Sequence, residues 1–93
     1  MLDRTLRELT DPTRREILRA LRERDLPAGE IAARFPITGA SVSHHLNVLK
    51  DAGLVQAERD GRSIVYSLNT TVFHEVMEEL MRYFSVGGSG DDA

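Results

Sequence analysis

Apolar residues recur three or four positions apart along most of the chain, which is the spacing of one face of a helix. The pattern predicts helices at about residues 2–9, 12–24, 28–35, 39–52 and 71–84. Asp11 before Pro12 is typical of an N-cap followed by proline at the first helical position. Thr38 is the expected cap of the fourth helix, and Gly53 is its expected left-handed C-terminal residue.

The spacing changes to that of strands between residues 54 and 68. Two runs, 54–59 and 63–68, carry β-branched and aromatic residues, and Asp60 and Gly61 between them form a hairpin turn signal. Only a few residues separate the third and fourth helices. Four helices, a hairpin and a fifth helix in this order predict a mainly α winged helix-turn-helix domain over residues 1–86, followed by a flexible Gly-, Ser- and Asp-rich tail at 87–93.

The chain has 93 residues and no cysteine. A domain of this size buries only about 60% of its unfolded surface, so a homodimer interface would add useful stability. The missing cysteines exclude a disulfide framework and thiolate metal sites. No apolar run approaches the ~20 residues of a membrane span, so we expect a cytoplasmic protein without a membrane partner. The sequence contains no catalytic constellation, and we predict neither an enzyme nor a cofactor.

The net charge of −3 argues at first against nucleic acid as a partner, because a DNA-binding domain is expected to be basic. The charge is unevenly distributed, however. Residues 1–70 carry 11 basic and 10 acidic side chains, a net +1, whereas residues 71–93 carry one basic and five acidic side chains, a net −4. The acidity therefore belongs to the last helix and the tail, away from the predicted helix-turn-helix.

The fourth predicted helix carries an arc of short polar residues. On a helical wheel of about 100° per residue, Val42, Leu46 and Leu49 fall on one side. The opposite arc holds Ala40, Ser43, His44, Asn47, Lys50 and Asp51. Reading base edges requires compact hydrogen-bonding groups, whereas an ordinary solvated face usually carries more Lys and Glu. We therefore predict that this arc binds double-stranded DNA, and a solvated helix face is the alternative.

Two adjacent histidines, His44 and His45, cannot chelate one metal ion, because neighbouring helical residues point about 100° apart. His44 lies at the edge of the polar arc, where it can contact a base or a phosphate. His45 lies on the buried flank near Leu49. A core histidine with one hydrogen bond is the expected role of His45.

Basic residues outside the fourth helix's arc are candidates for contacts with the DNA backbone. Arg59 and Arg62 flank the hairpin turn, from which they can reach phosphates or a narrow minor groove. Arg14 and Arg15 at the start of the second helix are further candidates, as is Lys50. Each of these residues is also compatible with an ordinary solvated charge.

The last predicted helix is apolar over about half of its circumference, which is more than burial in one small domain needs. We expect this excess to pack with the leucines of the first helix in a homodimer interface. The predicted interface comprises Leu2, Leu6, Leu9, Phe73, Val76, Met77, Leu80, Met81 and Phe84. The alternative is that the broad apolar stripe covers a thin core within one chain.

His74 and Glu78 lie four residues apart on the polar edge of the last helix, a spacing that can hold a metal. Two ligands are too few for a site unless a partner chain completes it with an acid such as Asp3. A surface face of salt bridges, which would include Glu75 and Arg82, is the plainer interpretation. We predict no metal at this position.

Three segments stand out: DPTRREIL at residues 11–18, SVSHHLNVLKDAGLV at 41–55 and GRSIVYSL at 61–68. They resemble the ArsR/SmtB family of bacterial and archaeal winged-helix transcription factors. The resemblance extends over about residues 5–84 and is to the metal-independent, SdpR-like autorepressor branch. It implies a homodimer formed through the first and last helices. It also implies that the fourth helix enters the major groove of a palindromic operator with the wing alongside, mostly to repress transcription.

By position, the resemblance implies that the base-reading face is formed by Gly39, Ala40, Ser43 and His44. Gly39 and Ala40 depart from the polar residues often found in the family. Specificity is therefore expected to depend more on DNA shape, on the wing arginines, and on Ser41, Ser43 and His44. The cysteine-based sensor that the family carries beside the third helix is missing, since residues 25–30 contain no thiol.

Together these patterns predict a homodimeric, sequence-specific DNA-binding regulator, a repressor rather than an activator. They identify no small-molecule or metal effector. A metal-responsive regulator of the same fold, with nitrogen and oxygen ligands for nickel or zinc, is one alternative. A winged helix that serves as a protein-interaction module without DNA binding is the other.

Overall fold

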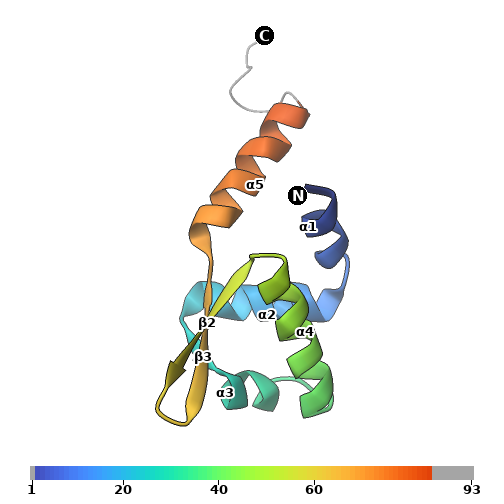
Figure 1. Cartoon of the computed structure of the whole chain (residues 1–93). Coiled ribbons are helices and arrows are strands. Elements are labelled where there is room, and N and C mark those ends of the chain that lie inside the picture. The colour runs from blue at the N-terminus through green and yellow to red at the C-terminus, as the bar shows by residue number, and fades with distance from the viewer. Residues whose placement is uncertain (1, 85–93) are drawn as a thin grey trace.

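The computed structural model describes residues 2–84, which form five helices and a small sheet (Figure 1). The helices are α1 (Leu2–Glu8), α2 (Pro12–Glu23), α3 (Ala28–Ala33), α4 (Gly39–Asp51) and α5 (Thr70–Tyr83). The predicted helices are therefore confirmed, with small differences at their ends. None of these helices is long and apolar enough to cross a membrane. The predicted tail at 87–93 and the end of the predicted domain lie outside the described residues.

Side-chain caps fix the starts of α2 and α4. Asp11 Oδ1 accepts hydrogen bonds from the backbone amides of Thr13 at 2.7 Å and Arg14 at 3.1 Å. Thr38 Oγ1 accepts a hydrogen bond from the amide of Ser41 at 3.1 Å. Both predicted caps are confirmed, and each satisfies amides that the first turn of a helix leaves without a partner.

The third helix is shorter than predicted, because it ends at Ala33 and not at Phe35. The amide of Arg34 donates to the carbonyl oxygen of Ile31 at 3.1 Å, three residues back, which tightens the last turn. Pro36 disfavours a helical conformation at the residue before it, so the helix does not continue. Phe35 nevertheless packs against the core from this position beyond the helix.

The sheet is antiparallel, with strand order β1-β3-β2. Its strands are β1 (Leu26–Pro27), β2 (Val55–Asp60) and β3 (Ser63–Leu68). The predicted hairpin is confirmed, but its turn is one residue later than predicted: Asp60 pairs with Ser63, and Gly61 and Arg62 form the loop. Gly61 has a φ of +65°, in the left-handed region that only glycine adopts without steric cost. β1 was not predicted, because two residues are too few to show a period.

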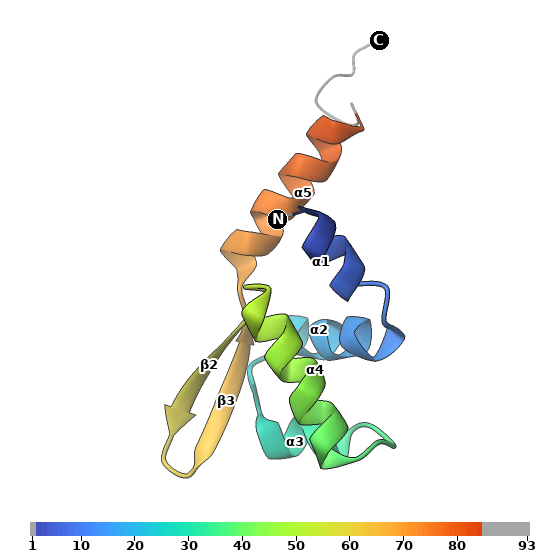
Figure 2. The same ribbon diagram turned by 45° about the vertical axis from the view of Figure 1, so that its right-hand side comes forward.

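The core lies between α2, α3, α4 and the base of the hairpin. Its buried members are Ile17, Leu18, Leu21, Leu26, Ile31, Val42, Leu46, Leu49, Leu54 and Val55. On each helix these residues occupy a single face, so the other face is left for solvent or a partner. α3, α4 and the hairpin tip lie at one end of the molecule, whereas α1 and the C-terminal end of α5 lie at the other (Figure 1, Figure 2).

Candidate nucleic-acid interface

α4 presents its predicted polar arc to solvent. The exposed positions include Gly39, Ala40, Ser43, His44, Asn47 and Lys50. The opposite face is held in the core by Val42, Leu46 and Leu49, which determines the side of the helix that faces solvent. Because hydroxyl, imidazole and amide groups can both donate and accept hydrogen bonds, the arc can match the polar edges of base pairs.

Ser41 is only partly exposed, unlike the other predicted contacts on α4. Its Oγ accepts a hydrogen bond from Thr38 Oγ1 at 3.1 Å, and its amide donates back to the same Thr38 oxygen at 3.1 Å. The helix cap therefore uses part of the hydrogen-bonding capacity of Ser41.

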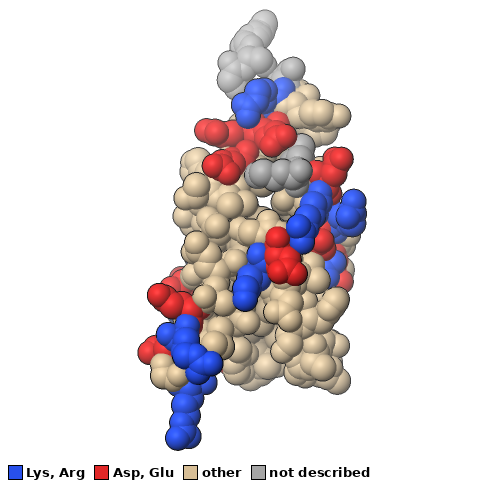
Figure 3. All heavy atoms as spheres, in the orientation of Figure 1, with Lys and Arg blue, Asp and Glu red and all other residues tan. Residues whose placement is uncertain are grey.

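The hairpin tip carries two exposed arginines next to two exposed acidic residues, Glu58 and Asp60. Arg59 and Arg62 are exposed, and within residues 2–84 neither forms an ion pair. Figure 3 shows Lys and Arg gathered at the tip, whereas the adjoining surface at the lower right of that view is uncharged. In both ribbon views α3 lies between the hairpin and α4. This arrangement allows arginines to contact phosphates while α4 contacts bases.

Two arginines at the start of α2, Arg14 and Arg15, form hydrogen bonds within the chain through their guanidinium groups. The side chain of Arg14 is only 14% exposed. Its Nε donates to the carbonyl oxygen of Glu8 at 2.9 Å, and its Nη1 lies 3.1 Å from Nδ1 of His45. This geometry favours a structural role over the predicted phosphate contact. Arg15 is exposed, although its Nη1 donates to the carbonyl oxygen of Leu9 at 2.7 Å.

His45 is half-buried and has one side-chain hydrogen bond, as predicted. Sequence reasoning missed its partner, Arg14. The two residues are 31 positions apart and lie on different helices, so no local spacing rule connects them. The contact depends on the packing of α2 against α4, which the positions of buried residues on each helix indicate only in outline.

The carboxyl group of Asp11, which caps α2, has a pKa below its ordinary value. Partial burial raises this pKa, but hydrogen bonds from the backbone amides of Arg14 and Thr13 and the nearby guanidinium group of Arg14 lower it by more. Hydrogen bonds from amides stabilise the charged carboxylate, as does the positive end of the helix dipole. Asp11 therefore interacts electrostatically with Arg14, whose guanidinium group also contacts His45.

Most of the predicted dimer residues that the structure describes are accessible. Leu6 is 39% exposed, Met77 52% and Phe84 63%, and Met81 is exposed as well. Leu9, Phe73 and Leu80 are half-buried. Val76 is an exception, because it packs within its own chain and has no surface left for a partner. The side chain of Leu2 lies outside what the structure describes. On α1, Thr5 occupies the buried position that the leucine pattern did not indicate.

His74 and Glu78 are both exposed on α5 and line a shallow groove with Phe73, Met77 and Met81. Among residues 2–84, no group of three or more His, Asp or Glu side chains is placed to hold a metal ion. The two candidate ligands therefore have no third ligand from the described part of their own chain.

Comparisons with known proteins agree with this arrangement. The helix-turn-helix domain family matches residues 9–56. The transcriptional repressor SdpR of Bacillus subtilis is 41% identical over 86 residues, which cover 92% of this chain and 96% of SdpR. The HTH-type transcriptional regulator NmtR of Mycobacterium tuberculosis is 43% identical over 75 residues, 81% of this chain and 62% of NmtR. An ArsR-like transcriptional regulator from Rhodococcus sp. RHA1 matches in structure with a TM-score of 0.82 and 32% identity, over 90% of this chain and 79% of that one.

The order of the elements, the exposed polar arc of α4 and the two exposed arginines of the hairpin at the same end of the molecule define a winged helix-turn-helix DNA-binding regulator. The similarity to SdpR extends over nearly the full length of both chains, and the structural similarity covers most of this chain. The chain belongs to the ArsR/SmtB family of transcriptional regulators.

Proposed function

We propose that the chain is a homodimeric transcriptional repressor that binds a palindromic DNA operator with α4 in the major groove and the hairpin beside it. The observation that carries this proposal is the exposed arc of mostly short and uncharged polar side chains on α4, at the same end of the molecule as the arginines of the hairpin tip. Base contacts specify a sequence, and phosphate contacts fix the register of the protein on the duplex. In this proposal the arc of α4 contacts the bases, and the arginines of the hairpin tip contact the phosphates.

The proposed DNA-contact residues are those predicted from the sequence with one omission. Arg14 is left out because its guanidinium is held by Glu8 and His45. The remaining set is Arg15, Gly39, Ala40, Ser41, Ser43, His44, Asn47, Lys50, Arg59 and Arg62. Gly39 and Ala40 offer no side-chain hydrogen bond, so their contribution is close approach of the helix start to the DNA.

The proposed homodimer is formed through the exposed apolar residues of α5 together with Leu6 of α1. Met77 and Met81 lie on α5, Phe84 follows its last residue, and each of the three is about half exposed or more. A symmetric dimer places two copies of α4 on one side of the duplex. Its half-sites are expected about 34–36 Å apart, one helical turn, or a multiple of that. A palindromic operator follows from this symmetry.

Repression is supported by the similarity to a named transcriptional repressor along nearly the whole chain. A dimer that occupies two successive major grooves covers promoter DNA and excludes another protein from it. The test is a reporter gene under the control of the operator, whose expression is expected to fall when the protein is produced. A rise in expression would indicate an activator of the same fold.

DNA binding itself is tested by fluorescence anisotropy with an operator obtained by selection from random oligonucleotides. We expect binding to that operator at least about 10³ times tighter than to a scrambled duplex, and a steep loss of affinity with salt. Equal affinity for both duplexes contradicts a sequence-specific regulator. If the protein binds no DNA and is a monomer or part of a hetero-oligomer, the result would favour the alternative of a protein-interaction module.

The metal-responsive alternative is tested in the same assay. Nickel or zinc chloride is added in one series and a chelator in another, and the operator affinity is expected to stay the same in both. A shift that His74→Ala abolishes would favour a metal site completed by the partner chain, because the described residues of one chain supply only His74 and Glu78 at this position.

A further inference from the structure

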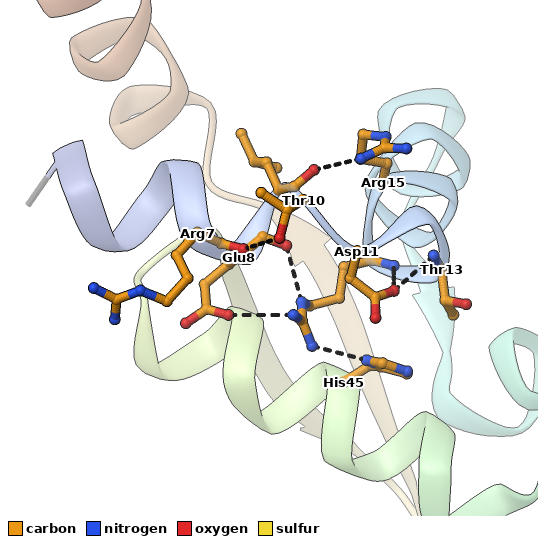
Figure 4. Close-up of polar contacts among 9 residues, drawn as sticks. Arg7, Glu8, Thr10, Asp11, Thr13, Arg15 and His45 are labelled. Atoms are coloured by element: carbon orange, nitrogen blue, oxygen red, sulfur yellow. Dashed lines mark hydrogen bonds and ion pairs between the residues drawn. The ribbon is translucent and has the colours of Figure 1, made fainter.

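Arg14 connects three helices through its guanidinium group, which contacts Glu8 and His45, both labelled in Figure 4. Its Nε donates a hydrogen bond to the carbonyl oxygen of Glu8, the last residue of α1, at 2.9 Å. Its Nη2 lies 3.5 Å from Oε1 of the Glu8 carboxylate, and its Nη1 lies 3.1 Å from Nδ1 of His45 on α4. One side chain at the start of α2 therefore holds both the end of α1 and the middle of α4.

These contacts are largely shielded from water. The side chains of Arg14 and Glu8 are 14% and 15% exposed, and His45 is half-buried. Shielding strengthens an ion pair relative to the same pair at the surface. It also raises the free-energy cost of leaving one of the two groups buried without its partner. The cluster therefore opposes a separate movement of α1 or α4.

The chemistry of the cluster defines which atom of His45 takes part. A guanidinium group has donors only, so Nδ1 of His45 accepts the hydrogen bond, and the ring proton is on Nε2. The amide oxygen of asparagine lies as many bonds from Cα as Nδ1 does, so it can accept in the same place. Leucine has a similar shape but no acceptor.

The connection between α1 and α2 is also fixed by local hydrogen bonds. Thr10 Oγ1 donates to the carbonyl oxygen of Arg7 at 2.7 Å, and Arg15 Nη1 donates to that of Leu9 at 2.7 Å (Figure 4). Asp11 then caps α2 through the amides that follow it. These hydrogen bonds fix α1 relative to the start of α2, and the contacts of Arg14 fix α4 relative to both.

The two ends of this connection belong to the two proposed binding surfaces. On α1, Leu6 is 39% exposed and belongs to the proposed dimer surface. On α4, His44 directly precedes His45, and the centroids of the two rings lie 5.9 Å apart. The side chain of His44 is on the exposed polar arc. Arg14 therefore lies between the dimer surface and the DNA-reading surface.

We propose that Arg14 is a positioning residue for operator recognition: it fixes α4 relative to the α1 part of the dimer surface and so sets the separation of the two reading helices. This inference rests on the proposed function. It assigns Arg14 no contact with DNA. Because a dimer recognises both half-sites at once, the property that Arg14 controls is the discrimination between operators of different half-site spacing.

The test compares Arg14→Met, which removes all donors, with the matched pair His45→Asn and His45→Leu. Each protein is titrated with the selected operator and with the same operator carrying one extra central base pair, which moves the half-sites apart by about 3.4 Å and rotates them by about 35°. Wild type and His45→Asn are expected to prefer the original spacing by at least about tenfold. Arg14→Met and His45→Leu are expected to bind both within about threefold.

Salt dependence separates positioning from a phosphate contact. We expect Arg14→Met to leave the slope of log affinity against log salt unchanged, because no ion is released at Arg14. A phosphate contact would lower the magnitude of that slope by about 1, and this result would overturn the proposal. Sedimentation velocity is expected to show a dimer for every variant.

Lost stability alone does not support the proposal. Variants that melt at lower temperature but keep the spacing preference would show that the cluster is structural only, and would overturn it. If Arg14→Met does not fold, the difference between His45→Asn and His45→Leu decides the question. Wild-type protein that binds no selected DNA contradicts the proposed function and this inference together, whereas a retained spacing preference in the variants contradicts this inference alone.

Discussion

α4 and α5 are helices of 13 and 14 residues that differ in how they are anchored and in what they expose. α4 is held by three buried apolar residues, and its exposed side carries short polar groups. α5 has one buried residue, Val76, whereas Met77 and Met81 on α5 and Phe84 directly after it are large exposed apolar side chains. α4 buries its large apolar side chains within its own chain, whereas α5 leaves several of them exposed.

This difference indicates two different partners. A polar arc can exchange hydrogen bonds with water for hydrogen bonds with base edges, without burying large apolar groups. Exposed apolar side chains gain about 25 cal/mol for each Å² that a second protein covers. The acidic residues Glu75, Glu78 and Glu79 on α5 also oppose contact of that helix with DNA. The comparison therefore supports the proposal that α4 binds DNA and that α5 binds a second copy of the chain.

The largest effect is expected from a charge in the apolar side of α5. Met77→Glu places a carboxylate where the proposed dimer buries a side chain that is 52% exposed in one chain. Burying an unpaired charge costs about 3 kcal/mol or more, so the dissociation constant of the dimer is expected to rise at least about 100-fold. Sedimentation velocity at several concentrations measures this constant.

Thr71→Glu is the matched control for Met77→Glu. It adds the same charge to the same helix, at an exposed position outside the apolar side. The dimer is expected to persist in this variant and to bind the operator. If Met77→Glu also remained a dimer with unchanged affinity, the assignment of α5 to a second copy would be wrong.

The next largest effect concerns the polar arc of α4. Ser43→Ala combined with His44→Ala removes two exposed hydrogen-bonding groups. A good base contact contributes about 1–3 kcal/mol of discrimination, so the ratio of operator to scrambled affinity is expected to fall at least about tenfold. Anisotropy titrations with both duplexes measure the ratio. Thr71→Ala on α5 removes an exposed hydroxyl outside the arc and should leave the ratio as it is.

A smaller and uniform effect is expected at the hairpin tip. Arg62→Gln removes one exposed positive charge from the two-residue loop. Operator and scrambled DNA are both expected to bind several-fold more weakly, and the salt slope should fall by about 1. Arg19→Gln, on an exposed part of α2, is the control for lost charge. A selective loss of operator affinity in Arg62→Gln would instead indicate that the wing reads sequence.

The division between α4 and α5 could be predicted from the sequence because it depends on local periodicity. Val42, Leu46 and Leu49 identify the buried face of α4 without any knowledge of the fold. The order of helices and hairpin likewise follows from changes in spacing and from turn signals. These features are repeated along the chain, so each is indicated by several residues.

Features that depend on single long-range contacts could not be predicted in this way. Arg14 resembles a free basic residue in the sequence, and only the packing of α2 against α4 brings it to His45. The burial of Val76 depends on where α5 meets its own chain, since its apolar neighbours Met77 and Leu80 have the same chemistry. β1 is two residues long and exists because β3 is beside it.

The smallest effect is expected in the scaffold that carries both surfaces, at Asp11. Asp11→Ala removes the cap of α2 and is expected to lower the free energy of unfolding by about 1 kcal/mol, whereas Asp11→Asn keeps a capping oxygen and lowers it by a few tenths to about 1 kcal/mol. The depressed pKa of Asp11 means that the folded protein favours its carboxylate. The stabilisation is therefore present above the ordinary value of 3.8 and is lost as the pH falls through the folded pKa.

Urea unfolding of wild type and Asp11→Asn at one protomer concentration tests this pH dependence, since the stability of a dimer varies with concentration. The difference in free energy of unfolding is expected to be largest near pH 7 and to shrink below pH 3.8. Asp25→Asn, at an exposed position between α2 and β1, is the control for the loss of a carboxylate. A difference between wild type and Asp11→Asn that stayed constant with pH would show that the cap depends on geometry and not on charge. In that case the charge of Asp11 would not help to hold Arg14 against His45, and the start of α2 would position α4 through packing alone.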